Sequence, residues 1–150
     1  MIEINNLTTN FVDEKFLKGV VEKVLKSENR KKSNLSVVLV GAGRMRKFNK
    51  RYRKKNKVTD VLSFGRSKKF PTTPESELGE IVICPQAVKK NAKKFDLSYN
   101  KELTRVLIHG VLHLLGYEYE KNEREAEKME KKQTIRDIVE VSNNRQSGWK

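Results

Sequence analysis

The stretch LIHGVLHLLGYEYE, Leu107 to Glu120, decides the fold and the chemistry of this chain. Its apolar residues recur at helical spacing as far as Gly116, so it predicts a helix that ends at a glycine in the left-handed conformation. His109 and His113 are the only histidines in the chain, and they stand four residues apart. Their side chains therefore lie about one turn apart on one helical face, where two imidazoles can share a metal ion. Two core histidines that hydrogen-bond to the backbone are the alternative.

Gly110 occupies the second position of this motif, where the zinc peptidases with the sequence H-E-x-x-H carry a glutamate. That glutamate is their general base, so its absence disfavours a peptidase. A glycine inside a helix costs about 1 kcal/mol relative to alanine. We therefore expect another part of the molecule to approach the helix backbone closely at Gly110.

The flanking sequence predicts a single α+β domain over residues 1–141, followed by a flexible tail at 142–150. Asn100 is expected to cap the histidine helix, and the apolar stripe of the first helix is expected to begin at Phe11 and Val12. The order β-α-β-α-β-β-α-α-α predicts a small mixed sheet of four strands packed with about five helices. Strands are expected at residues 2–4, 35–41, 58–64 and 78–84, and helices at 11–27, 44–57, 85–95, 101–115 and 122–141.

The charge of the chain favours an anionic partner. With 33 basic and 19 acidic residues the net charge is +14, and nucleic acid is the commonest partner of such a protein, although a basic surface can also serve solubility alone. No run of about 18 apolar residues predicts a membrane span, and the N-terminus lacks the order of a signal peptide. The single cysteine, Cys84, cannot form an internal disulfide, which favours the reducing cytoplasm.

The positive charge is concentrated in RMRKFNKRYRKKNK, residues 44–57, which holds nine basic residues and no acidic one. Lys50, Lys54, Lys55 and Lys57 are candidates for contacts with backbone phosphates, which position a nucleic acid without reading its sequence. The apolar residues of this segment, Met45, Phe48 and Tyr52, are spaced so that they form one edge that docks on the core. Stacking of Phe48 and Tyr52 on bases is the alternative.

Several segments together resemble the YbeY family of single-strand-specific endoribonucleases, which mature ribosomal RNA. HGVLHLLGYEY is similar to the family signature H-G-x-L-H-L-x-G-Y-D-H, and FNKRYRKKNKVTDVLSF to its N-x-x-Y-R-x-K-D-x-P-T-D-V-L-S-F segment. LGEIVICPQAV and EAEKM resemble two further family segments, in the same order along the chain. The resemblance implies a metal-dependent hydrolase with an α+β fold, a zinc ion held by three histidines, and ribosomal RNA and the small ribosomal subunit as partners.

The resemblance places the first two zinc ligands at His109 and His113 but leaves the third open. Tyr119 stands where the family has its third histidine, Glu118 replaces the preceding aspartate, and Val58 replaces the proline of P-T-D. Three hypotheses follow. Tyr119 binds through its phenol oxygen, which demands loss of a proton with a pKa near 10. Glu118 or Glu120 completes a set of two histidines and a carboxylate. Or no ion is bound.

Arg53 matches the arginine of the family segment, and its guanidinium can stabilise the charge of a phosphodiester transition state. If a metal is bound, we expect it to activate a water that attacks the phosphodiester. Ser63 and Cys84 are read as core positions rather than nucleophiles, since neither has an obvious partnering base. The leading hypothesis is thus a cytoplasmic endoribonuclease with one zinc ion, bound weakly or not at all. The alternative is a metal-free or catalytically impaired RNA- or ribosome-binding maturation factor.

Overall fold

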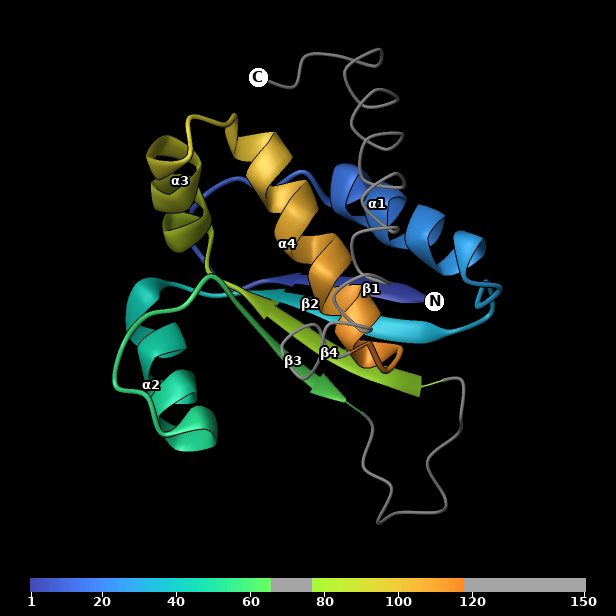
Figure 1. Ribbon diagram of the computed structural model, residues 1–150, viewed down its shortest axis with the longest axis horizontal. Helices are drawn as coiled ribbons and strands as arrows, with labels where there is room; N and C mark the ends of the chain where they lie inside the picture. The colour runs from blue at the N-terminus through green and yellow to red at the C-terminus, as the bar shows by residue number, and fades with distance from the viewer. Residues whose placement is uncertain (66–76, 118–150) are drawn as a thin grey trace.

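The computed structural model describes residues 1–65 and 77–117 and shows a mixed four-stranded sheet with helices on both faces (Figure 1). The α+β class and the predicted order of elements are confirmed as far as these residues extend, with four of the five expected helices among them. The fifth predicted helix, 122–141, and the tail, 142–150, lie outside the described residues. The elements are β1 (Ile2–Asn6), α1 (Glu14–Ser27), β2 (Asn34–Leu39), α2 (Ala42–Arg53), β3 (Val61–Gly65), β4 (Glu77–Ile83), α3 (Pro85–Lys94) and α4 (Tyr99–Leu114).

The strands lie in the order β1-β2-β4-β3, so β4 is central although it follows β3 in the chain. β1 pairs with β2 and β2 with β4 in parallel, whereas β3 pairs with β4 antiparallel. The register places Ile4 beside Val37 and Val37 beside Ile81, which aligns β-branched side chains across one face. This order leaves β3 at an edge of the sheet.

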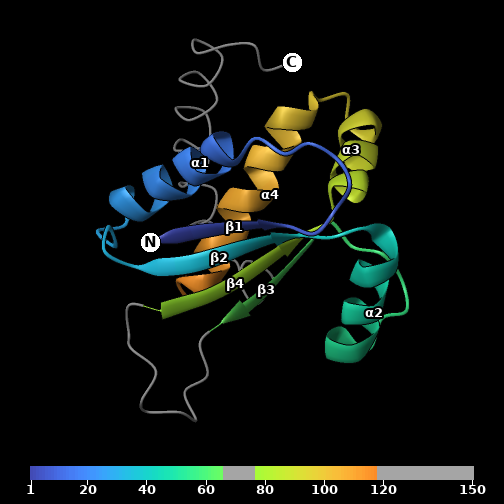
Figure 2. The same ribbon diagram turned by 180° about the vertical axis from the view of Figure 1, so that it is seen from behind.

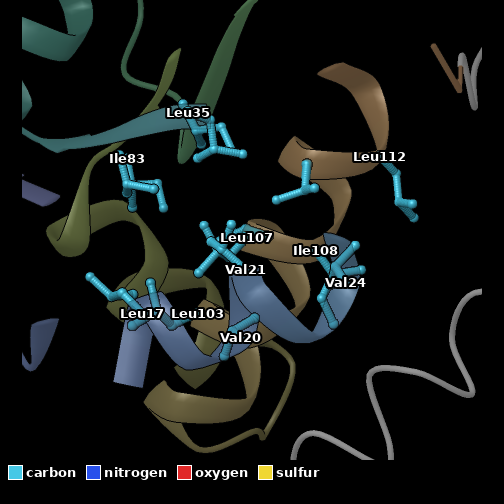
Figure 3. Close-up of a cluster of buried hydrophobic side chains, with 14 of the residues drawn as sticks. Leu17, Val20, Val21, Val24, Leu35, Ile83, Leu103, Leu107, Ile108 and Leu112 are labelled. Atoms are coloured by element: carbon cyan, nitrogen blue, oxygen red, sulfur yellow. The ribbon is translucent and has the colours of Figure 1, made fainter. Parts of the chain in front are cut away.

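The main core lies between one face of the sheet and the helices α1 and α4, with α3 beside α4 (Figures 1 and 2). α1 and α4 are amphipathic, and each turns its apolar stripe inward. Figure 3 shows Val20, Val21 and Val24 of α1 near Leu107 and Ile108 of α4, and all five are buried. α4 is thus the central helix of the core, and its position is fixed by packing on several sides.

A second, smaller cluster lies on the opposite face of the sheet, where α2 packs. Val82 of β4 and Leu62 of β3 point to this side, and Met45 of α2 is fully buried there. Cys84 belongs to the same cluster and is fully buried, as expected of a core position. α2 is therefore anchored by a narrow apolar edge, while its other faces stay in water.

Three predicted helix boundaries are wrong, each for a local reason. α1 begins at Glu14 because the Asp13 side chain accepts a hydrogen bond from the backbone N–H of Phe16, so Phe11 lies outside the helix and is 90% exposed. α4 is capped by Ser98, not Asn100. α2 ends at Arg53 rather than Lys57, because Lys54 adopts a left-handed conformation with φ of 61°.

None of the described helices is both long enough and apolar enough to cross a membrane.

Candidate active site

A pocket of about 730 Å³ lies along the edge strand β3, between α4 and the end of α2. Its walls come from three parts of the chain that are distant in sequence. The described lining residues are Tyr52, Arg53, Thr59, Asp60, Val61, Leu62, Ser63, Phe64, Gly65, Arg105, Val106, His109, His113 and Leu114. The pocket therefore brings together both histidines and the arginine that the sequence singled out.

His109 and His113 face this pocket from α4. His109 is half-buried and His113 is exposed, whereas Ile108 and Leu112 on the opposite side of the helix are fully buried. The helix is closed by Gly116, with φ of 103°, whose N–H donates to the carbonyl of His113, and by Tyr117, whose N–H donates to the carbonyl of Leu112. This is the left-handed stop predicted from the sequence. The core-histidine alternative fails for His113, because its side chain is open to solvent.

Gly110 explains how closely α4 approaches the sheet. A Cβ atom at this position would lie 3.1 Å from Cγ2 and 3.3 Å from Cδ1 of Ile81, and 3.4 Å from Oγ of Ser63. The Ser63 hydroxyl also donates a hydrogen bond of 3.3 Å to the carbonyl of Gly110. The predicted close approach is confirmed, and it sets the distance of the histidine helix from β3 and β4.

Arg53 reaches the same pocket from the last residue of α2. The residues after it, 54–57, form a basic loop that is folded back on the helix. The side-chain amide of Asn49, itself buried, donates to the carbonyl of Lys57 at 2.8 Å, and Arg46 donates to the side chain of Asn56 at 2.9 Å. These bonds hold Lys54, Lys55 and Lys57 near Arg53, and the four side chains are exposed.

The two aromatic residues of α2 differ in how deeply they are buried. Phe48 is half-buried against the second cluster, as a docking edge requires. Tyr52 is 53% exposed, lines the pocket, and meets Phe64 of β3 edge to face with ring centroids 5.0 Å apart. The docking edge is therefore confirmed for Met45 and Phe48, while Tyr52 is placed at the mouth of the pocket.

Ser63, Asp60 and Arg105 line the pocket, although the sequence did not predict them as site residues. Ser63 was read as a core position, but it is half-buried and lines the pocket. Asp60, just before β3, lies there with its carboxylate 3.4 Å from the amide nitrogen of Asn91, and Arg105 lies one turn before His109. The spacing rule that paired the two histidines also puts Arg105 on their helical face, so its position was available from the sequence.

The described residues fit part of a zinc site. Two imidazoles at i and i+4 in one pocket suit a single ion. In residues 1–65 and 77–117 no group of three or more His, Cys, Asp or Glu side chains is placed to hold a metal. The third ligand proposed from the sequence, at Tyr119, Glu118 or Glu120, lies outside the described residues.

Two imidazoles and an arginine in one pocket, with a basic loop directly after that arginine, suit an enzyme that acts on the phosphodiester bonds of a polyanion. Comparison with known proteins gives the particular family. The family model described as Endoribonuclease YbeY matches residues 3–139, and the chain belongs to this family.

Individual relatives of known family support this assignment. The chain is 41% identical over 118 residues to the endoribonuclease YbeY of Persephonella marina. The aligned region spans 79% of this chain and 77% of that relative. It is 45% identical over 97 residues to the endoribonuclease YbeY of Thermodesulfovibrio yellowstonii, and the aligned region spans 65% of this chain and 60% of that relative. A Thermotoga maritima protein solved in solution has the same fold, with a TM-score of 0.64 and 31% identity over 93% of this chain and 89% of that one.

Proposed function

We propose that this endoribonuclease cleaves single-stranded segments of ribosomal RNA precursors with the help of one zinc ion at His109 and His113. The observation that carries the proposal is the meeting of both imidazoles and Arg53 in one pocket, although they come from α4 and α2. We further propose that it acts on the small ribosomal subunit in the cytoplasm. A single, fully buried cysteine, Cys84, supports a reducing compartment.

The zinc ion and the protein side chains have different roles in the proposed cleavage. A bound zinc ion would lower the pKa of a water molecule and polarise a phosphoryl oxygen. Arg53 then holds the phosphodiester in the pocket, where its planar fork can bind two oxygens and offset the charge that grows on them. Lys50, Lys54, Lys55 and Lys57 hold the flanking phosphates, since all four are exposed and lie within four residues of Arg53 in the sequence.

We propose Tyr119 as the third zinc ligand, with Glu118 or Glu120 as the alternative. A phenol must lose its proton to bind, so zinc binding should be weak, easily reversed by a chelator, and stronger at high pH. The opposite wall of the pocket offers Asp60, but the described residues do not bring it together with both imidazoles as a metal-binding group.

A zinc titration against a competing chelator tests this proposal. Tyr119→His should tighten zinc binding by more than about 100-fold, the upper end of what outer ligand-supporting groups contribute, because a ligand itself is improved. It should also raise the rate at which a single-stranded oligoribonucleotide is cleaved. Tyr119→Phe is the matched control: if zinc binding is unaffected by it, the third ligand is Glu118 or Glu120.

A metal-free RNA- or ribosome-binding factor is the second candidate function. It is favoured by the sequence, in which Tyr119 stands where the family has its third histidine. It predicts that neither the unmodified protein nor Tyr119→His binds zinc, and that both still bind RNA. Zinc-stimulated cleavage that is lost in His109→Ala and His113→Ala would reject it.

A further inference from the structure

We propose that Arg105 is a second RNA-phosphate ligand of the pocket, and that buried Glu102 is the residue that orients it. This rests on the proposed function, because it assumes that RNA enters the pocket beside His109 and His113. It adds a contact on the α4 wall, opposite Arg53 on α2.

The two side chains form a close, two-pronged ion pair within α4. Nε of Arg105 donates to Oε1 of Glu102 at 2.8 Å, and Nη2 donates to Oε2 at 2.7 Å. The Glu102 side chain has no exposed surface, whereas that of Arg105 is 31% exposed and lines the pocket. The carboxylate is thus inside the protein and the guanidinium stands at the boundary between core and pocket.

Stability alone does not account for this arrangement. A buried ion pair is often no more stabilising than apolar residues of similar size, because both charges lose their hydration. Glu102 sits among the buried residues of α4, next to Leu103, where an apolar side chain would fill the space. What the carboxylate adds is direction: two parallel bonds fix the plane of a guanidinium that is otherwise carried on a flexible stem.

Arg105 is fixed in a useful place. It precedes His109 by four residues and His113 by eight, so all three side chains share one helical face, and all three line the pocket. It lies about 6 Å along the helix axis from His109. A phosphate at the histidines and Arg53 would therefore leave Arg105 to meet the neighbouring phosphate on the same strand.

The salt dependence of RNA binding tests the contact. Binding of a short oligouridine is measured over a range of salt concentrations, with chelator present so that the RNA is bound and not cut. Loss of one phosphate contact should reduce the magnitude of the log–log slope by about 0.7. We expect this loss in Arg105→Met, together with about tenfold weaker binding at low salt, whereas Arg105→Lys should keep the slope.

Two controls separate this contact from other effects. Arg30→Met removes the same charge from an exposed position that does not line the pocket, so its slope should stay near that of the unmodified protein. Arg105→Met leaves Glu102 buried without its partner and can unfold the protein. The double variant Glu102→Met with Arg105→Met removes that difficulty, and its slope should be reduced by the same amount.

Glu102→Gln tests the positioning role. It keeps the charge of Arg105, so the slope should be retained, but it weakens the fork, so kcat on a single-stranded oligoribonucleotide should fall more than KM rises. If Glu102 has a purely structural role, Glu102→Gln should lower the melting temperature without reducing kcat more than it raises KM.

The outcomes distinguish this proposal from the one on which it rests. Salt-independent RNA binding by the unmodified protein would overturn both. If RNA binding depends on salt but the double variant has the same slope as Arg30→Met, only the proposed role of Arg105 is overturned. Arg105 would then serve only to neutralise Glu102.

Discussion

Replacing Gly110 by alanine would test whether close packing of α4 on the sheet positions the histidines. Alanine favours a helix by about 1 kcal/mol over glycine. Against this, the new Cβ would lie 3.1 Å from Cγ2 of Ile81, which is fully buried and cannot move aside without disturbing the core. Crowding of this kind typically costs about 1–3 kcal/mol. The expected net effect is a loss of about 0–2 kcal/mol in the free energy of unfolding.

Gly19 in α1 is the matched control for this substitution. It also lies inside a helix, but a Cβ at Gly19 would have no neighbouring atom within 4 Å. Gly19→Ala should therefore stabilise the protein by about 1 kcal/mol. Urea denaturation should give a higher midpoint for Gly19→Ala than for Gly110→Ala, with stabilities about 1–3 kcal/mol apart.

A double-mutant cycle identifies the source of the crowding. Ile81→Val deletes Cδ1, the atom that would lie 3.3 Å from the new Cβ, so Gly110→Ala should cost less in that background. The reasoning is refuted if Gly110→Ala stabilises the protein as much as Gly19→Ala does. In that case β4 would not determine how closely α4 packs.

Three further predictions concern RNA binding, catalysis and pH. Exchange of Lys50, Lys54 and Lys57 for alanine should flatten the log–log salt slope of single-stranded RNA binding by about 2, at about 0.7 for each lost contact; an unchanged slope would remove these lysines from the interface. Arg53→Lys should lower the cleavage rate while RNA affinity stays within a few fold, because lysine keeps the charge but not the fork; equal losses in rate and affinity would make Arg53 a binding residue only. Burial, with a smaller contribution from Cys84, raises the pKa of Tyr99 above its ordinary value of 10.0. Because the folded state holds that proton more tightly, the stabilisation is complete below pH 10.0 and is lost as the pH rises through the folded-state pKa. Chemical denaturation of Tyr99→Phe and the unmodified protein at alkaline pH should show a smaller decline in the variant.

Local patterns made much of the fold predictable. β2 and β4 contain β-branched runs, α3 starts with a proline in its first turn, and α4 is followed by Gly116, whose positive φ suits glycine. The pairing of His109 with His113 followed from helix geometry alone. These features depend on residues close together in the sequence, and single-chain patterns describe such neighbours well.

The starts of α1 and α4 were harder to predict, because several nearby residues can cap each of these helices. Ser98 and Asn100 both have side chains that accept hydrogen bonds, and it is Ser98 that accepts one from the backbone N–H of Lys101. In the same way Asp13 caps α1 and leaves Phe11 outside, although hydropathy would include it.

The position of the pocket could not be predicted from sequence patterns, because it depends on the order of the strands in the sheet. β4 inserts between β2 and β3, which moves β3 to the edge and brings Asp60 and Ser63 beside α4. Periodicity gives each strand an inner and an outer face, but it does not say which strand lies next to which. Ser63 was consequently assigned to the core.

α4 has a consequence for the order in which the molecule can be assembled during synthesis. It packs on β3 and β4 and, together with α1, buries the main core against the sheet, yet it is synthesised after every strand. A nascent chain that ends before Leu103 lacks the α4 side chains that complete the core around Val37, Ile81 and Ile83, so these residues would be partly exposed. Such an intermediate is prone to aggregation. Because the same helix carries His109 and His113, the pocket forms only when this apolar face is covered. A chain truncated within α4 is therefore expected to lose solubility together with activity.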